Sequence, residues 1–467
     1  MKTCPICHKP VPGRECENCG YDLSGDFIAF RTLSPVSEAD RELLKTRREL
    51  AATKIKPAPK SKWWIALIPV LALVLLFASR EKPEPPEPTP VVTVMPAPTP
   101  EPDIYFRYKA VNGGITITGY EGELPAELVL PEEFKGNRVK AIGESAFADC
   151  DGLTSVTIPE GVERIEREAF TDCDRLASLT LPESLTSIGD YAFYGGSCLK
   201  SVTIPESVTF IGDSAFRDTQ WYDHQTDPGG FVIVGDSVLL KYCGTDSKAT
   251  IPNGVKSISG WAFSDCANLK NITIPEGVTS IGDWAFYECV GLTSVTIPAS
   301  VKSIGGWAFF DCANLKSITI PESVTSIGYY AFGACSGLKN ISVETGNRLY
   351  SSQDGILFDK AKTTLVCWPA GRSGSYEIPK GVTSIGNGAF SVCSGLTSVT
   401  IPDSVTSIGD SAFYCCNSLT SVTIPDSVTS IGDSAFDGCE KLRSVTIPAN
   451  CEVGENAFPD TCTVIRR

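Results

Sequence analysis

Four cysteines near the N-terminus have the spacing of a metal-binding motif. Cys4, Cys7, Cys16 and Cys19 form the pattern C-x2-C-x8-C-x2-C in the run CPICHKPVPGRECENCGYDL. Each close pair can present two thiolates to one tetrahedral ion, and four thiolates are a ligand set of structural zinc sites. Because protein ligands then fill all four positions, such an ion has no open position for catalysis.

Residues 1–26 are too few to bury a hydrophobic core, so one structural Zn²⁺ ion would supply much of their folding free energy. The segment resembles the zinc ribbons of many bacterial proteins over residues 1–24. Two disulfides or a four-thiolate iron site would use the same cysteines. His8 is a further possible ligand, but the four cysteines already suffice for zinc.

The remaining composition argues against catalysis and against binding of nucleic acid. The 467 residues include two histidines, His8 and His224, so the repeated positions offer no Ser-His-Asp or Cys-His arrangement. The formal net charge is −15, with acidic residues spread over the chain, which disfavours a nucleic-acid footprint. We therefore do not expect an enzyme.

Residues 63–79 are predicted to form one transmembrane helix. The run WWIALIPVLALVLLFA, from Trp63 to Ala78, has no charged residue. At about 1.5 Å per residue it spans about 24 Å, which is short of a ~30 Å hydrocarbon layer. Ser79 extends the helix, and Lys60 and Lys62 can reach the interface with their side chains. The alternatives are a buried core helix or a displaced signal peptide.

The flanking segments predict the orientation of this span. Residues 27–62 are rich in Lys and Arg, whereas only Arg80 and Lys82 follow the span closely. This asymmetry places residues 27–62 and the zinc ribbon in the cytoplasm, and the rest of the chain outside the cell membrane. Residues 80–103 are rich in proline, which predicts an extended stalk.

A repeat of 23 residues dominates residues 104–467. The dipeptide Ala-Phe recurs, with Phe at positions 147, 170, 193, 216, 263, 286, 309, 332, 390, 413, 436 and 458. One unit, LTSVTIPASVKSIGGWAFFDCAN, predicts a short strand around Val295 and Ile297 that ends at Pro298. A second extended piece follows from Val301 to Ile304. No unit can bury its apolar face alone, so the repeats must stack into a solenoid of short parallel strands.

The pattern L-x-x-V-x-I-P-x-x-V-x-x-I-G-x-x-A-F-x-x-C resembles the BspA-type leucine-rich repeats of bacterial surface proteins. The resemblance covers residues 104–467 and implies a repeat protein with a mostly β leucine-rich-repeat solenoid. The pattern lacks the Asn that follows the strand in the common leucine-rich consensus, so it does not imply horseshoe curvature.

Nine cysteines recur three residues after the Phe of a repeat, which predicts buried thiols with a structural role. The period is broken near residues 217–250 and 344–377. The runs Phe231 to Tyr242 and Ile356 to Trp368 there predict hairpins, either set into the array or projecting from it. Such insertions can carry functional surfaces or can be divergent repeats.

Four aromatic residues precede Ala-Phe in consecutive repeats: Trp261, Trp284, Trp307 and Tyr330. Other repeats place Ser, Glu, Gly or Asn there, a range that predicts an exposed position. The stripe is therefore either a ligand-binding surface for sugar rings or a protein, or a stabilising aromatic ladder without a ligand.

Together these features predict a membrane-anchored surface binding protein or adhesin with an extracellular protein or glycan ligand. The alternative is a transmembrane structural or signalling protein whose zinc ribbon recruits a cytoplasmic protein partner.

Overall fold

The computed structural model describes residues 2–3, 10–11, 105–227, 229–235 and 237–467. In the N-terminal unit, residues 1–97, β1 (Lys2–Thr3) pairs antiparallel with β2 (Pro10–Val11). The predicted zinc ligands Cys4, Cys7, Cys16 and Cys19, the predicted span 63–79 and the predicted stalk 80–103 lie outside the described residues. Within the described ranges, no helix is both long enough and apolar enough to span a bilayer.

The second unit, residues 98–467, is a solenoid in which each regular repeat contributes two short strands. Strands of the first sheet ladder have a buried Val, Leu, Ile or Ala near their middle in most repeats, and neighbours pair in parallel. They are β5 (Glu127–Val129), β8 (Ser155–Thr157), β10 (Ser178–Thr180), β15 (Lys248–Thr250), β17 (Asn271–Thr273), β19 (Ser294–Thr296), β21 (Ser317–Ile320), β23 (Asn340–Val343), β27 (Gly374–Glu377), β29 (Leu396–Thr400), β31 (Ser421–Thr423), β33 (Ser444–Ile447) and β35 (Thr463–Arg466).

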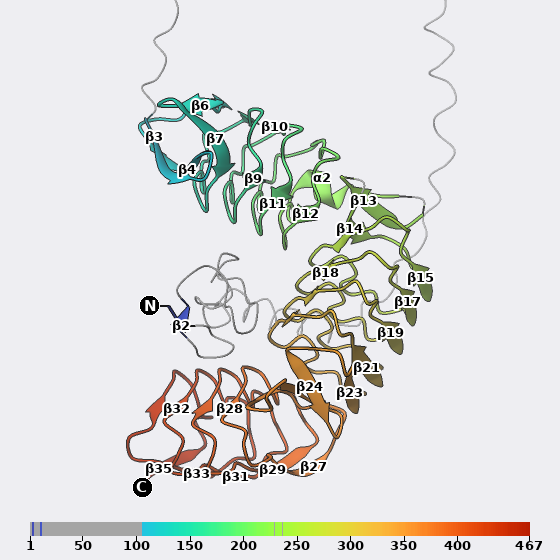
Figure 1. The fold of residues 1–467 in the computed structure, drawn as a ribbon, viewed down its shortest axis with the longest axis vertical. Coiled ribbons are helices and arrows are strands. Elements are labelled where there is room, and N and C mark those ends of the chain that lie inside the picture. The colour runs from blue at the N-terminus through green and yellow to red at the C-terminus, as the bar shows by residue number, and fades with distance from the viewer. Residues whose placement is uncertain (1, 4–9, 12–104, 228, 236) are drawn as a thin grey trace, which may run out of the picture. The chain divides into compact units, whose positions relative to one another are not determined.

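Strands of the second sheet ladder come later in each repeat, and most end at a buried Ile. They are β7 (Asn137–Ile142), β9 (Arg164–Ile165), β11 (Ser187–Ile188), β12 (Phe210–Ile211), β14 (Val238–Tyr242), β16 (Ser257–Ile258), β18 (Ser280–Ile281), β20 (Ser303–Ile304), β22 (Ser326–Ile327), β26 (Thr364–Cys367), β28 (Ser384–Ile385), β30 (Ser407–Ile408), β32 (Ser430–Ile431) and β34 (Glu452–Val453). Figure 1 shows β15, β17 and β19 side by side, away from β18 of the second ladder.

The first strand of the repeat forms as predicted, and the second is shorter than predicted. β19 contains Val295, and Pro298 follows it after two residues. The extended piece expected from Val301 to Ile304 is reduced to β20, because the Val301 N–H bonds the Pro298 carbonyl at 3.1 Å in a tight turn. The register between neighbouring repeats is in step, for example Ile258 with Ile281.

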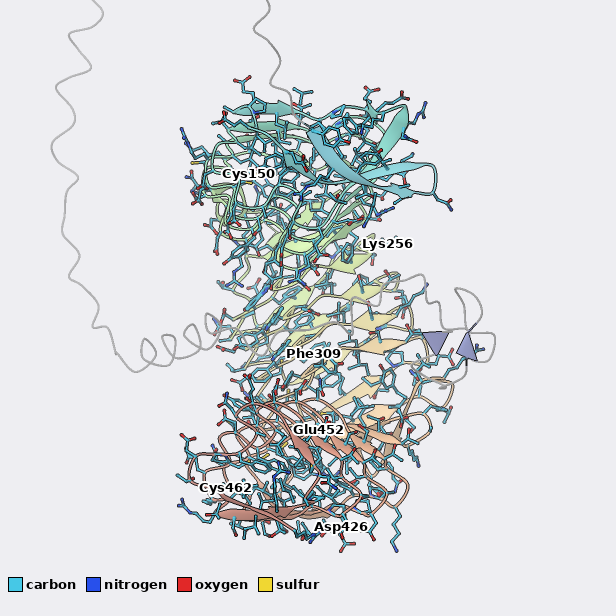
Figure 2. The ribbon with its side chains drawn as sticks, turned by 90° about the vertical axis from the view of Figure 1, so that its left-hand side faces the viewer. Cys150, Lys256, Phe309, Asp426, Glu452 and Cys462 are labelled. Carbon is cyan, nitrogen blue, oxygen red and sulfur yellow. The ribbon has the colours of Figure 1, made fainter. Side chains whose placement is uncertain are left out.

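Stacked phenylalanines form the centre of the solenoid. The rings of Phe263, Phe286 and Phe309 lie nearly parallel, with centroids 4.8 and 5.0 Å apart. Figure 2 labels Phe309, which is fully buried among the stacked repeats. The preceding Ala is also buried and is small enough to let the next repeat approach. The predicted solenoid of stacked parallel strands is confirmed.

The cysteines after Phe cap carbonyl groups of the preceding repeat. The Sγ atoms of Cys289 and Cys416 donate to the carbonyl oxygens of Phe263 and Phe390, each at 3.0 Å. Both thiols are buried and form no disulfide. The structural role predicted from the sequence is confirmed for these two residues.

Both predicted hairpins are present and are set into the array. β13 (Phe231–Val234) pairs antiparallel with β14, and β14 pairs in parallel with β16 of the next repeat. β25 (Ile356–Asp359) pairs antiparallel with β26, and β26 pairs in parallel with β28 of the next repeat. The further strand β24 (Tyr350–Gln353), which pairs with β25, was not expected from the sequence.

The hairpins divide the core into three clusters, each with its own phenylalanine stack. Trp221, in the short helix α2 (Gln220–Asp223), packs edge-on against Phe216 at the end of the first stack. Tyr242 and Trp368 pack at the start of the second and third stacks. The N-terminal end carries β3 (Tyr105–Val111), β4 (Gly114–Glu121) and β6 (Glu133–Phe134), and β4 joins the second ladder beside β7.

Candidate ligand-binding surfaces of the solenoid

The four aromatic residues singled out from the sequence form one continuous stack. Ring centroids are 5.1 Å apart for Trp261 and Trp284, 5.0 Å for Trp284 and Trp307, and 4.9 Å for Trp307 and Tyr330. The planes of neighbouring rings differ by 5 to 14°. The spacing follows from the parallel pairing of β16, β18, β20 and β22, since neighbouring strands lie about 4.8 Å apart. We call these four residues the aromatic stack.

Each residue of the aromatic stack has a left-handed backbone. The φ angles are 63° at Trp261, 54° at Trp284, 50° at Trp307 and 56° at Tyr330. The same position has positive φ in the other repeats, where it is held by Ser145, Glu168, Tyr191, Ser214, Gly388, Ser411, Ser434 and Asn456. This conformation is unfavourable for a bulky side chain. The ring contacts must therefore offset the strain at the three tryptophans.

Other groups cover both ends of the aromatic stack. The guanidinium carbon of Arg217 lies 4.1 Å from the Trp261 ring centroid. At the other end, a Cβ placed on Gly388 would lie 2.4 Å from Cε1 of Tyr330, so the glycine backbone packs directly on that ring. Burial raises the pKa of Tyr330 to about 12. The expectation that the stripe is exposed is therefore wrong, because all four side chains are half-buried.

This burial limits how the aromatic stack can meet a ligand. A sugar ring binds to the face of an aromatic ring, and the inner faces are taken by neighbouring rings. The four side chains remain partly exposed. The role of Trp261, Trp284, Trp307 and Tyr330 in binding stays a prediction.

Three acidic side chains, Asp190, Asp213 and Asp283, form a row in which each stands three residues before the Phe of its repeat. The Asp190 Oδ1 atom accepts the N–H of Asp213 at 2.9 Å, and the Asp213 Oδ1 accepts the N–H of Asp283 at 3.0 Å. Asp283 in turn accepts the N–H of Gly306. Asp213 reaches Asp283 by crossing Gly260, where a Cβ would lie 1.8 Å from its Oδ1 atom. These side chains cap backbone N–H groups that no strand pairing satisfies.

The pKa values of Asp213 and Asp283 in this row are raised. Burial, and then the neighbouring Asp283 and Asp190, raises the pKa of Asp213 well above its usual value. Burial also raises the pKa of Asp283 to about 6, although the hydrogen bond from Gly306 opposes the rise. Burial and the two neighbouring carboxyl groups therefore favour the protonated form of Asp213.

A polar groove of about 500 Å³ crosses the second ladder in the last repeats. Four consecutive strands, β28, β30, β32 and β34, line it. Its polar side chains are Ser384, Asn387, Ser407, Asp410, Ser430 and Glu452. The Ser407 hydroxyl donates to the Ser384 hydroxyl at 3.0 Å, and the Asn387 amide approaches Asp410 at 3.4 Å. Glu452, labelled in Figure 2, is exposed.

Sequence reasoning missed Arg217, the aspartate row and this groove. The signal for the row and the groove is present in the repeated run Ser-Ile-Gly-Asp, which puts a hydroxyl and a carboxylate at fixed places in successive repeats. Arg217 has no counterpart in the pattern, because no other repeat has an arginine directly after its Phe.

The described residues do not bring three or more metal-binding side chains together. This finding leaves the predicted zinc site untouched, because Cys4, Cys7, Cys16 and Cys19 lie outside those residues.

Comparison with known proteins places the repeats in a family. The family described as BspA type leucine-rich repeat region matches residues 133–238, 232–353 and 372–466, which together make up more than half of the chain. A search of curated proteins gave no match.

Several solved structures are similar to the solenoid. A leucine-rich cell surface protein from Faecalibacterium prausnitzii is 30% identical, with 77% of this chain and 87% of that chain covered and a TM-score of 0.41. A leucine-rich repeat protein from Bacteroides ovatus is 23% identical, with 78% and 98% covered and a TM-score of 0.29. The pneumococcal vaccine antigen PcpA is 20% identical, with 78% and 86% covered and a TM-score of 0.35. From the match to its repeats, the chain belongs to the BspA-type leucine-rich repeat family.

Proposed function

We propose that this chain is a membrane-anchored cell-surface binding protein whose solenoid binds an extracellular protein or glycan, and that it is not an enzyme. In this proposal residues 63–79 span the membrane and residues 80–103 hold the solenoid away from it. The zinc ribbon, with one Zn²⁺ ion on Cys4, Cys7, Cys16 and Cys19, lies in the cytoplasm and is available to a protein partner there.

The groove in the last repeats is the observation that carries the binding function. Its volume of about 500 Å³ lies within the range of ligand sites, and hydroxyl, amide and carboxylate groups line it. These groups recur at the strand spacing of about 4.8 Å from one repeat to the next. A ligand that offers polar groups at regular intervals along an extended chain fits this arrangement. Both glycans and extended peptides have this property.

The test is a binding screen with the full-length chain in detergent micelles against glycans and extracellular proteins. The informative variant combines Asp410→Asn with Glu452→Gln. Asn387 already occupies the position equivalent to Asp410 and accepts the Asp410 N–H at 3.0 Å, so Asn at 410 keeps the capping hydrogen bond. We expect the variant to fold normally and to lose at least tenfold in affinity for the best ligand of the screen.

The matched control is Thr296→Ser in β19, an exposed residue of the first ladder far from the groove in sequence. It should bind as the unmodified chain does. If the unmodified chain binds no member of the screen, the proposed function is wrong. If binding is unchanged in the Asp410 and Glu452 variant, the groove is not the binding surface.

A further inference from the structure

The aromatic stack ends in a positive charge that has no partner in the described part of the chain. Arg217 lies over Trp261 at 4.1 Å, and no hydrogen bond or ion pair joins its guanidinium to a described residue. Burial, and then the neighbouring carboxylate Asp218, raises the pKa of the Tyr194 hydroxyl to about 12, which places Asp218 beside Tyr194. Stacking on an indole covers one face of a guanidinium but leaves its in-plane N–H groups free to donate.

A second arginine in the solenoid shows the ordinary arrangement. Arg167 lies 5.9 Å from the ring of Tyr191, which occupies the position of Trp261 in an earlier repeat. Its guanidinium is neutralised by Glu168, with an N–O distance of 2.7 Å. Arg217 thus differs from Arg167 in having an aromatic contact without a carboxylate of its own.

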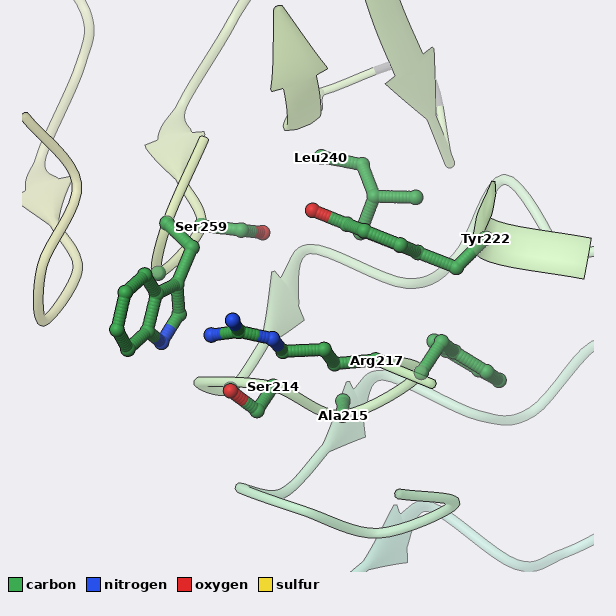
Figure 3. A pocket seen from close by; sticks show the side chains of 10 residues that line it. Ser214, Ala215, Arg217, Tyr222, Leu240 and Ser259 are labelled. Carbon is green, nitrogen blue, oxygen red and sulfur yellow. The ribbon is translucent and has the colours of Figure 1, made fainter. Parts of the chain in front are cut away.

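The surroundings of Arg217 form a small pocket with further donors. Figure 3 shows its side chain reaching between Ser214 and Ser259, with Tyr222 and Leu240 nearby. The hollow has a volume of about 10 Å³. The indole N–H of Trp261, which also lines it, is buried and has no acceptor among the described residues. A buried donor without an acceptor is costly, so an incoming oxygen atom would be stabilised here.

The size and charge of the pocket select the kind of anion. A volume of about 10 Å³ admits a single oxygen atom but not a tetrahedral phosphate or sulfate group. A planar carboxylate can place one oxygen there while both of its oxygens accept hydrogen bonds from the in-plane N–H groups of Arg217.

We propose that Arg217 and Trp261 form a subsite for the carboxylate of an acidic glycan, one built from uronic acid residues. The carboxylate pairs with the in-plane N–H groups of Arg217, and hydroxyl groups of the sugar meet the partly exposed side chains of the aromatic stack. Stacking on Trp261 fixes the guanidinium before the ligand arrives, which lowers the entropy cost of binding. This inference rests on the proposed binding function and names its ligand chemistry.

The experiment is calorimetric titration of the full-length chain in detergent micelles with oligogalacturonate. Its methyl ester, which has the same rings without charge, is the second ligand, and an oligoglutamate peptide of equal charge is the third. We expect oligogalacturonate to bind at least tenfold more tightly than the other two. Arg217→Gln and Trp261→Ser should each weaken its binding at least tenfold. The first variant removes the charged partner of the carboxylate, and the second removes the ring that holds the guanidinium in place.

The control variant is Arg167→Gln, which removes an equal charge next to an aromatic ring and should leave the dissociation constant unchanged within a factor of about two. Ser already occupies the position of Trp261 at Ser145 and Ser214, so Trp261→Ser should fold. If it does not, Arg217→Gln alone decides the matter.

Unchanged oligogalacturonate binding in Arg217→Gln overturns the subsite, and so does an equal loss in Arg167→Gln. Arg217-dependent binding of oligoglutamate without binding of oligogalacturonate overturns the glycan assignment. These results are distinct from failure of the proposed function itself, in which the unmodified chain binds none of the glycans or proteins in the screen.

Discussion

At the scale of single residues, Gly260 determines how the repeats before the β13–β14 hairpin are joined to the repeats after it. We call these the first and second blocks of repeats. The Asp213 side chain passes over it to the N–H of Asp283, which is 70 positions later in the sequence. With any side chain at 260, a Cβ would lie 1.8 Å from the Asp213 carboxyl oxygen, and the hydrogen bond would be lost. One missing Cβ therefore allows a polar contact across an irregular hairpin.

The raised pKa values of Asp213 and Asp283 make the stability of this junction depend on pH. Because the folded-state pKa lies above the usual value of 3.8, each group adds stability that is fully present below pH 3.8 and is lost as pH rises through the folded pKa. A rise from 3.8 to about 6 at Asp283 corresponds to roughly 3 kcal/mol. We expect urea unfolding of the first and second blocks to need less denaturant at pH 8 than at pH 5.

The variant that isolates this effect is Asp213→Asn, which keeps an acceptor for the Asp283 N–H but cannot ionise. It should flatten the change in unfolding midpoint between pH 5 and pH 8. Asp410→Asn is the comparison, because the amide of Asn387 approaches Asp410 where Asp213 faces other carboxyl groups. Equal flattening in both variants would show that general charge repulsion, and not this row, produces the pH dependence.

At the scale of the repeat element, the aromatic stack combines strained backbone with favourable ring contacts. Its residues occupy positions with φ between 50° and 63°, where Ser, Asn, Gly, Glu or Tyr stands in other repeats. Stacked rings contribute about 0.5 to 1.5 kcal/mol per pair beyond their burial, which is of the same order as the strain. The net contribution of the stack to folding is therefore small compared with that of the phenylalanine core.

We expect the double variant Trp284→Ser and Trp307→Ser to fold and to lose about 1 to 4 kcal/mol of unfolding free energy, since three ring contacts disappear. Ser411 and Ser434 show that serine adopts the required backbone. Circular dichroism and denaturant unfolding measure both points. Phe286→Ser, in the core stack, serves as the contrast and should prevent folding of its block.

The same double variant separates the two roles of the aromatic stack. Retained folding with loss of ligand binding in the screen assigns a binding role to Trp284 and Trp307. Retained folding with unchanged binding makes the stack a stabilising ladder, and the subsite at Arg217 would then involve only its first ring.

The period of 23 residues was sufficient to predict the stacked strands and the buried cysteines. These features depend on contacts between neighbouring repeats, which a repeated sequence specifies directly. The burial of the aromatic stack could not be predicted in this way. Arg217 and Gly388 reach Trp261 and Tyr330 across the two irregular segments, where the period is lost. The hydrogen bond from Asp283 to Asp213 likewise spans an interval that the repeat does not define.

At the scale of the whole molecule, the sequence predicts parts with separate roles on the two sides of a membrane. The isolated segment from Met1 to Asp26 should bind one zinc ion and should be unfolded without it, because four thiolates replace a core it cannot form. Metal analysis and circular dichroism with a chelator measure this. Cys16→Ser should abolish folding of the segment, whereas His8→Ser should not. A metal-free, disulfide-bonded segment would contradict the prediction.

The charge asymmetry around residues 63–79 predicts which part of the chain is accessible from outside. Protease added to intact cells should digest the solenoid and spare the zinc ribbon, as detected with epitope tags at the two termini. Permeabilised cells, in which both tags should be lost, provide the control. Protection of the solenoid in intact cells would reverse the orientation.

The pairing of strands between repeats also determines how the solenoid responds to mechanical load. Hydrogen bonds of the second ladder join repeats along the solenoid axis, and each regular contact is only two residues long, as between β18 and β20. Tension between the two ends would therefore peel the repeats apart one at a time at low force. The hairpins β13–β14 and β25–β26 add antiparallel pairing at two points, where peeling should pause. In the proposed role as a surface binding protein, the solenoid would therefore lengthen gradually under flow.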